Sequence, residues 1–167
     1  MKGYPFTRYK DFSGRTVAFR LILPQETDRS GIVRVKRDDI YLHGTRNIDM
    51  WWRDKTSNGQ LWYIEDAPYP GYFKIRNKET LLYLDGSGGR ASAWHWTGYD
   101  RQYWKIVNLP DCVYCSIENK LPPNPSDDPN NRFLCGSLKG VTQWHWINMW
   151  HQKWAVIDED ELLRTDW

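Results

Sequence analysis

The sequence has few cysteines, no long apolar run near its start and almost no net charge. Its three cysteines (Cys112, Cys115 and Cys135) are an odd number, which favours free thiols in a reducing compartment. Charged side chains interrupt residues 1–20, so no signal peptide or membrane span is expected there. A net charge of +2 gives no broad attraction to nucleic acid or to anionic membranes. We therefore expect a cytoplasmic protein, retained or released by a non-classical route, with no nucleic-acid partner and no membrane insertion.

Motifs for metal binding and for catalysis are also missing. Cys112 and Cys115 form one C-x-x-C, whereas a structural zinc site needs a second pair or histidines at short spacing. The glycine-rich residues 86–89 are not followed by the Lys-Ser/Thr and the helix of a phosphate-binding loop. The four histidines lie at repeat-equivalent places and not in a ligand motif: His43, His95, His145 and His151. We expect no metal, no cofactor and no enzymatic activity.

Aromatic residues, by contrast, are abundant. Eleven Trp and ten Tyr among 167 residues are more rings than a small core needs. The surplus suits a surface that binds flat or sugar-like ligands. The alternative is that a β-rich domain collects aromatic residues for its own packing. The composition leaves both readings open for any single ring.

One segment of the chain recurs three times. Residues 83–104 align without a gap on residues 41–62, which lie 42 positions earlier, and on residues 133–154, which lie 50 positions later. Each copy opens on a Leu-x-Gly turn, continues to a Trp and closes on Gln-x-Trp. Three copies at this spacing in one short chain predict a single closed domain with three lobes.

Each copy shows four alternating runs broken by Gly, Asn and Asp, which predict four strands. Helical periodicity is lacking, apart from one turn that we allow for residues 158–163. The fold class is therefore all-β, with twelve strands and pseudo-threefold symmetry. The copies span about 29–69, 70–110 and 111–158, preceded by an N-terminal extension (1–28) and followed by an acidic tail (159–167).

The first strand of copy one has two candidates. Either residues 32–35 form it and residues 16–23 are an extension, or residues 16–23 form it and a long loop follows. The spacing does not decide between them. Copy three differs from the others by an insertion over residues 121–130, whose Pro, Asn and Asp content predicts a surface loop.

The three Gln-x-Trp motifs, each with an upstream Trp and a Leu-Asp-Gly-like turn, resemble those of the ricin-B type β-trefoil lectins. The match is strongest in copy two and loosely extends to leaderless plant and fungal trefoil lectins. The resemblance implies a β-trefoil that binds glycans without catalysis. Secreted relatives often bridge two strands of a copy by a disulfide. In this chain those places hold Tyr83 with Trp96 and Phe133 with Trp146, so aromatic packing would replace the disulfide.

The resemblance also carries binding roles onto copy two. It makes Asp85 an acceptor for sugar hydroxyls and Trp94 the stacking ring, and we expect Asp85 to be an exposed turn carboxylate. The third polar position, usually Asn, holds Arg101, which would either donate to hydroxyls or pair with Asp85 and block it. Gln102 joins this candidate carbohydrate site, although its main role, like that of Trp104, is expected to be structural.

Copies one and three lack the carboxylate and are therefore secondary candidates. Copy one keeps Trp52 and has His43 in the Asp position, and copy three keeps Trp144 and has His151 beside its Gln. A different sugar face could bind to Trp51 with Trp52, or to Trp144 with Trp150. The alternative is that these two copies have only a structural role. The sequence ranks copy two first.

We expect a lectin whose partners are glycans or glycoconjugates and whose assembly into oligomers is left open. One alternative is a protease inhibitor that acts through the residue 121–130 loop. The other is a sugar-binding module of a larger toxin or glycosidase. The sequence does not specify the sugar or its linkage.

Overall fold

The structure is a computed structural model. It describes residues 11–21, 26–27, 33–34, 40–44, 47–54, 56–86, 89–110, 113–120, 132–137 and 140–164. The expected surface loop (121–130) and Cys112 lie outside the described residues.

Six strands close into a barrel, two from each copy. Neighbours around it pair antiparallel in the order β1–β6–β7–β10–β11–β14 and back to β1. The strands are β1 (Thr16–Leu21), β6 (Trp62–Asp66), β7 (Tyr72–Asn77), β10 (Trp104–Asn108), β11 (Cys115–Asn119) and β14 (Trp154–Asp158). Each copy gives its first and its fourth strand, so the barrel closes only when all three copies are present.

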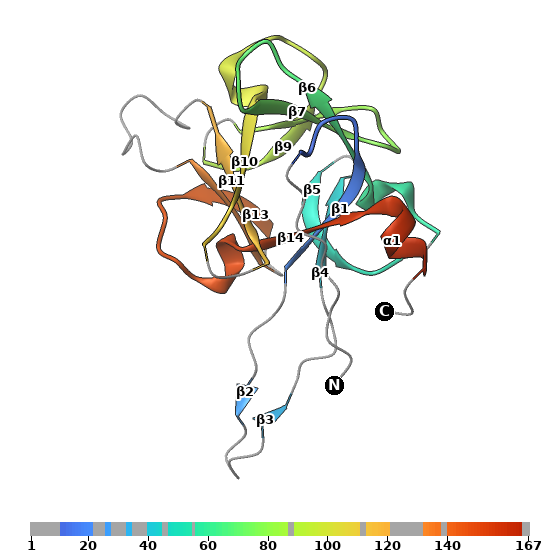
Figure 1. Cartoon of the computed structure of the whole chain (residues 1–167), viewed down its shortest axis with the longest axis vertical. Coiled ribbons are helices and arrows are strands. Elements are labelled where there is room, and N and C mark those ends of the chain that lie inside the picture. Colours follow the sequence, from blue (N-terminus) through green and yellow to red (C-terminus); the bar gives the residue numbers. More distant parts are fainter. Residues whose placement is uncertain are drawn as a thin grey trace.

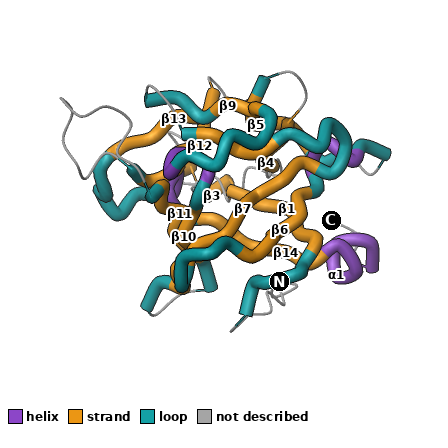
Figure 2. Tube along the Cα trace, turned by 90° about the horizontal axis from the view of Figure 1, so that it is seen from above, coloured by secondary structure: helices purple, strands orange, loops and turns teal. Residues whose placement is uncertain are grey.

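The second and third strands of each copy form a hairpin outside the barrel. The hairpins are β4 (Ile40–Gly44) with β5 (Ile48–Trp52), β8 (Tyr83–Asp85) with β9 (Ser92–Trp94), and β12 (Phe133–Ser137) with β13 (Gly140–Trp144). Figure 2 shows β5, β9, β12 and β13 together on one side of the barrel strands β6, β10 and β14. Twelve strands in this arrangement confirm the β-trefoil expected from the repeats.

The first strand of copy one is β1 (residues 16–21). Of the two candidates that the sequence left open, the more N-terminal one forms this strand. The trefoil therefore extends N-terminal of residue 29. Val33–Arg34 (β3) instead pairs with Glu26–Thr27 (β2), and Figure 1 shows this small sheet apart from the barrel. The expected helical turn is α1 (Glu159–Arg164), whose Leu162 packs on the outer side of β1 and β14. No helix among the described residues is long and apolar enough to cross a membrane.

The Trp of each Gln-x-Trp motif lies fully buried in the core. Trp62, Trp104 and Trp154 donate their indole N–H to the carbonyls of Leu42, Leu84 and Leu134, at 3.0, 2.8 and 3.1 Å. Each bond joins the fourth strand of a copy to its own hairpin, 20 residues earlier. Because a buried indole N–H needs an acceptor, this bond fixes where the hairpin sits on the barrel.

A glycine stands two residues after each of these leucines, because the hairpin backbone there passes close to other buried side chains. A Cβ on Gly136 would lie 2.9 Å from the Trp154 ring and 2.5 Å from Leu21 Cδ1. On Gly44 it would lie 2.8 Å from the Trp62 ring. The repeated Leu-x-Gly turn is therefore required by the core, whereas its middle residue is left to vary.

Truncating a core Trp should unfold the protein, and truncating an exposed one should not. We expect Trp104→Ala to lower the free energy of unfolding by about 3–5 kcal/mol, because it removes a fully buried ring and leaves a cavity. Trp94→Ala is the matched control, since its ring is 52% exposed and should cost only about 0.5 kcal/mol. Urea denaturation of both variants measures the difference, and equal losses would contradict this assignment of core and surface.

Candidate carbohydrate site

The Gln of each motif holds the loop that leads from the hairpin back to the barrel. Gln102 is fully buried; its Nε2 donates to the carbonyl of His95 at 2.9 Å, and its Oε1 accepts from the backbone N–H of Thr97 at 2.8 Å. Gln152 makes the same two bonds with His145 and Ile147, at 2.7 and 2.9 Å. Gln60 bonds Trp52 and Asp54 in the same way. Gln102 is thus a structural residue and offers no polar group to a ligand, which corrects its place among the sugar-binding candidates.

The residue before each Gln lies on a short 3₁₀ helix. The helices are η1 (Asn58–Gln60), η2 (Asp100–Gln102) and η3 (Trp150–Gln152). In copy two the carbonyl of Arg101 accepts from the backbone N–H of Gly86 at 2.9 Å and from Nδ2 of Asn119 at 2.8 Å. The Gly59 carbonyl in copy one accepts from Asn77 Nδ2 at 3.0 Å. An Asn of the following copy therefore fixes the backbone at the third polar position of copies one and two.

The stacking candidates Trp52, Trp94 and Trp144 all lie exposed on the outer face of the hairpins. Their neighbours on the other face are buried, since Ala91 and Ala93 point into the core. The alternation expected within the strands of each copy therefore holds over residues 91–94. In place of a disulfide, Tyr83 packs on Trp96 with ring centroids 5.0 Å apart, and Phe133 packs on Trp146 at 5.3 Å. These pairs match the aromatic packing expected at those positions.

The site of copy two is occupied by its own side chains. Asp85 is 2% exposed, so the expectation of an exposed turn carboxylate is wrong. Its Oδ2 accepts from Nε of Arg101 at 3.1 Å, and the Arg101 side chain is 33% exposed. Of the two roles foreseen for Arg101, the structure has the pairing with Asp85. The group of this pair that reaches solvent is therefore a guanidinium and not a carboxylate.

The site of copy one is filled by a histidine. Nδ1 of His43 lies 3.0 Å from Oδ1 of Asp49, its cross-strand neighbour. A Cβ placed on Gly59 would lie 2.9 Å from Nε2 of His43 and 2.7 Å from Oε2 of Glu79. The imidazole thus lies against the glycine at the third polar position. Trp52 keeps its exposed ring, but the polar space next to it is taken.

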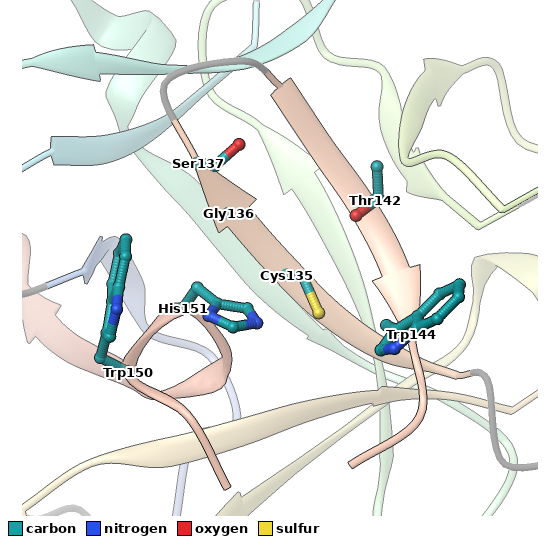
Figure 3. A pocket seen from close by; sticks show the side chains of 7 residues that line it. All are labelled: Cys135, Gly136, Ser137, Thr142, Trp144, Trp150 and His151. Carbon is teal, nitrogen blue, oxygen red and sulfur yellow. The ribbon is translucent and has the colours of Figure 1, made fainter. Parts of the chain in front are cut away.

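The site of copy three is open. A pocket of about 270 Å³ is lined by Cys135, Gly136, Ser137, Thr142, Trp144, Trp150 and His151. Figure 3 shows Trp144 and Trp150 on its two sides, with the thiol of Cys135 and the ring of His151 between them. A thiol where copy two has a carboxylate, and an imidazole where it has a guanidinium, leave the space unfilled.

Burial keeps the polar groups of this pocket uncharged. It raises the pKa of the Cys135 thiol to about 11, a shift that the Gln152 amide beside the sulfur opposes. It also lowers the pKa of His151 below its usual value. At neutral pH the floor of the pocket therefore carries a thiol and a neutral imidazole, which donates from one ring nitrogen and accepts at the other. This arrangement can bond a hydroxyl or an amide but gives no charge for an ion.

Sequence reasoning named Trp144, Trp150 and His151 in this copy but missed Ser137, Thr142 and the pocket itself. It ranked copy three low because a cysteine replaces the carboxylate. The signal that could have found the pocket is the identity of the two residues at these repeat-equivalent positions. Copy three has Cys135 and His151 there, a small side chain and a neutral one, where copy two has an ion pair. The order of the three copies in sugar affinity stays a prediction.

Comparisons with known proteins place the chain among lectin-like trefoils. Residues 51–124 match the family model described as ricin-type beta-trefoil lectin domain-like. Over these residues the chain is similar to the ricin-type β-trefoil lectins, as its repeats suggested. No curated protein sequence matches it significantly.

Several solved structures share the fold. SeviL, solved bound to asialo-GM1 saccharide, is 12% identical with a TM-score of 0.63, over 88% of this chain and 99% of that one. The designed threefold-symmetric protein ThreeFoil is 18% identical with a TM-score of 0.59, over 84% and 98%. The Polyporus squamosus lectin, solved with a human-type influenza-binding epitope, is 18% identical with a TM-score of 0.62, over 87% and 50%. At these identities the likeness concerns the fold.

Removing Asp85 should cost some stability, contrary to what an exposed carboxylate would do. We expect Asp85→Ala to lower the free energy of unfolding by about 1–2 kcal/mol, because Arg101 stays partly solvated once its partner is gone. Arg101→Gln should cost more, since it leaves a carboxylate buried beside a weaker donor. Thermal or urea denaturation of both variants tests this order. A larger loss of unfolding free energy for Asp85→Ala than for Arg101→Gln would contradict it.

The buried thiol gives a second test. Cys135 should resist a thiol reagent at pH 8 in the folded protein, because burial keeps it protonated well above that pH. After denaturation without reductant, all three cysteines should react. Counting the reactive thiols before and after denaturation measures both the protection of Cys135 and the total number of free thiols. A total of one would mean a disulfide and would contradict the expected reducing compartment.

Proposed function

We propose that this protein is a non-catalytic lectin and that the pocket of copy three is its site for uncharged sugars. The observation that carries the proposal is the open space of about 270 Å³ between the rings of Trp144 and Trp150. Its position is the one at which the threefold repeat puts an exposed Trp next to a variable polar pair. The lectin-like family match and the saccharide-bound neighbours support the same class of ligand.

The pocket has the two kinds of group that a pyranose needs. Trp144 and Trp150 offer apolar planes to the C–H faces of a sugar ring. Between them, the hydroxyl of Thr142 and the neutral His151 offer donors and acceptors, and the hydroxyl oxygen of Ser137, which donates to the Gly140 carbonyl, offers an acceptor. Because none of these groups is charged at neutral pH, the pocket suits a neutral hexose or an N-acetylated one.

Protonation of His151 should weaken this binding. An imidazolium would be placed in the pocket beside a neutral thiol, with no counter-charge from Cys135. Since burial lowers the pKa of His151, the neutral form persists through pH 7, and binding should decline only under more acidic conditions.

A glycan array followed by calorimetric titration tests the proposal. Trp144→Ala and Trp150→Ala should each weaken the best neutral ligand about tenfold or more, because truncating a central aromatic contact costs about 2 kcal/mol. Trp52→Ala is the matched control: it removes an equally exposed Trp from copy one, where His43 fills the polar space, and should leave the affinity unchanged.

Two results would overturn this assignment. If no glycan binds and a protease panel gives the only response, the chain is an inhibitor and not a lectin. If Trp52→Ala abolishes binding while Trp144→Ala does not, the sugar site lies in copy one.

A further inference from the structure

Copy two presents a fixed arginine on its surface. Nε of Arg101 is held by Asp85 Oδ2 at 3.1 Å, and its carbonyl is held by Gly86 and Asn119. The guanidinium carbon lies 5.0 Å from the centre of the Tyr99 ring, a cation–π contact. Backbone, side chain and guanidinium plane are therefore all held in place before any ligand arrives.

This arginine keeps donors for a ligand. A guanidinium has five N–H groups, and its terminal Nη1 and Nη2 make no hydrogen bond to the part of the chain that the structure describes. These two nitrogens form a fork whose spacing matches the two oxygens of a carboxylate or sulfate. Asp85 cannot compete for the ligand's hydroxyls, because only 3% of its side chain is exposed.

Copy two has several exposed rings, of which Tyr99 lies against the arginine. Trp94, Trp96 and Tyr99 all have large exposed fractions and belong to one segment of copy two. Lys74 lies on the same surface, with Nζ 5.0 Å from the centre of the Trp96 ring. No carboxylate among the described residues lies within ion-pairing distance of Lys74, whereas Arg76 and Lys120 are paired with Glu65 and Asp100. Copy two thus combines aromatic planes with two cations that are available to an anion.

Copy three shows that the fold does not require these charges. The positions of Lys74, Tyr99 and Arg101 hold Ser116, Met149 and His151 there, and the two copies keep the same ring geometry. The centroids of Trp94 and His95 are 4.9 Å apart and those of Trp144 and His145 are 5.0 Å apart. The cations of copy two are therefore an addition to a shared scaffold, which points to a ligand of different charge.

We propose that copy two binds an acidic sugar, with the anion on Nη1 and Nη2 of Arg101 and the sugar ring on Trp94. This rests on the proposed lectin function and assigns a second ligand class to it. Lys74 lies over Trp96, where it can meet a further anionic group of an oligosaccharide. The recognised chemistry is a carboxylate or a sulfate next to an apolar ring face.

The test titrates the full chain with sialyllactose, sulfated lactose and lactose. We expect at least one acidic ligand to bind about ten- to a hundredfold more tightly than lactose at copy two, because a charge-assisted bidentate bond replaces a neutral one. This preference should shrink as salt is raised. Comparing the two acidic ligands separates a carboxylate from a sulfate as the favoured anion.

Variants locate the effect. Arg101→Gln combined with Asp85→Asn removes both charges and avoids a buried unpaired carboxylate, and it should abolish the acidic preference. Lys74→Gln, a surface change that leaves the ion pair intact, should reduce that preference without unfolding the protein. Trp144→Ala is the control: it should remove neutral binding in copy three and leave the acidic preference in place.

Each outcome has a distinct meaning. Equal affinity for acidic and neutral ligands would overturn the inference. So would an acidic preference that survives both the double variant and Lys74→Gln. In either case, neutral binding at copy three would still support the lectin function. Loss of all glycan binding would overturn both. Equal binding of a short single-stranded oligonucleotide, in competition with the sugar, would show a general anion patch and would also overturn it.

Discussion

The bond from a buried indole N–H to a leucine carbonyl, made once in each copy, is the constraint on which this molecule depends. It ties Trp62, Trp104 and Trp154 to the hairpins that precede them and so places each hairpin on the barrel. The barrel needs strands from all three copies, so the bonds act together. Because they use only main-chain acceptors and buried side chains, the outer face of every hairpin is left free to change.

That freedom explains three unequal sites on one scaffold. The middle residue of the Leu-x-Gly turn and the residue before Gln face each other in every copy, and their sizes and charges decide what remains between them. His43 against Gly59 fills the space, Asp85 with Arg101 closes it with an ion pair, and Cys135 with His151 leaves it open. The exposed Trp beside each pair is common to all three.

The repeats made the fold predictable from the sequence, because Gln-x-Trp and the strand alternation record contacts within one copy and recur three times. The strand that begins copy one was not decided, since its pairing with β14 joins the two ends of the chain and no local pattern reports it. The burial of Asp85 was missed for a related reason. A carboxylate in a turn is expected to be exposed unless the fold is known to bring a cation such as Arg101 next to it. Likewise, the pocket of copy three depends on what Cys135 and His151 leave unoccupied, which residue types alone do not show.

The central claim, that the surface tryptophans bind sugar while the motif tryptophans hold the fold, is tested most directly by NMR of the indole N–H groups. The eleven tryptophans give distinct probes in one spectrum. On titration with the best neutral sugar, the signals of Trp144 and Trp150 should move, and those of Trp62, Trp104 and Trp154 should stay in place. Movement confined to Trp52, or no movement of Trp144 and Trp150 at a sugar concentration that saturates the protein, would contradict the account.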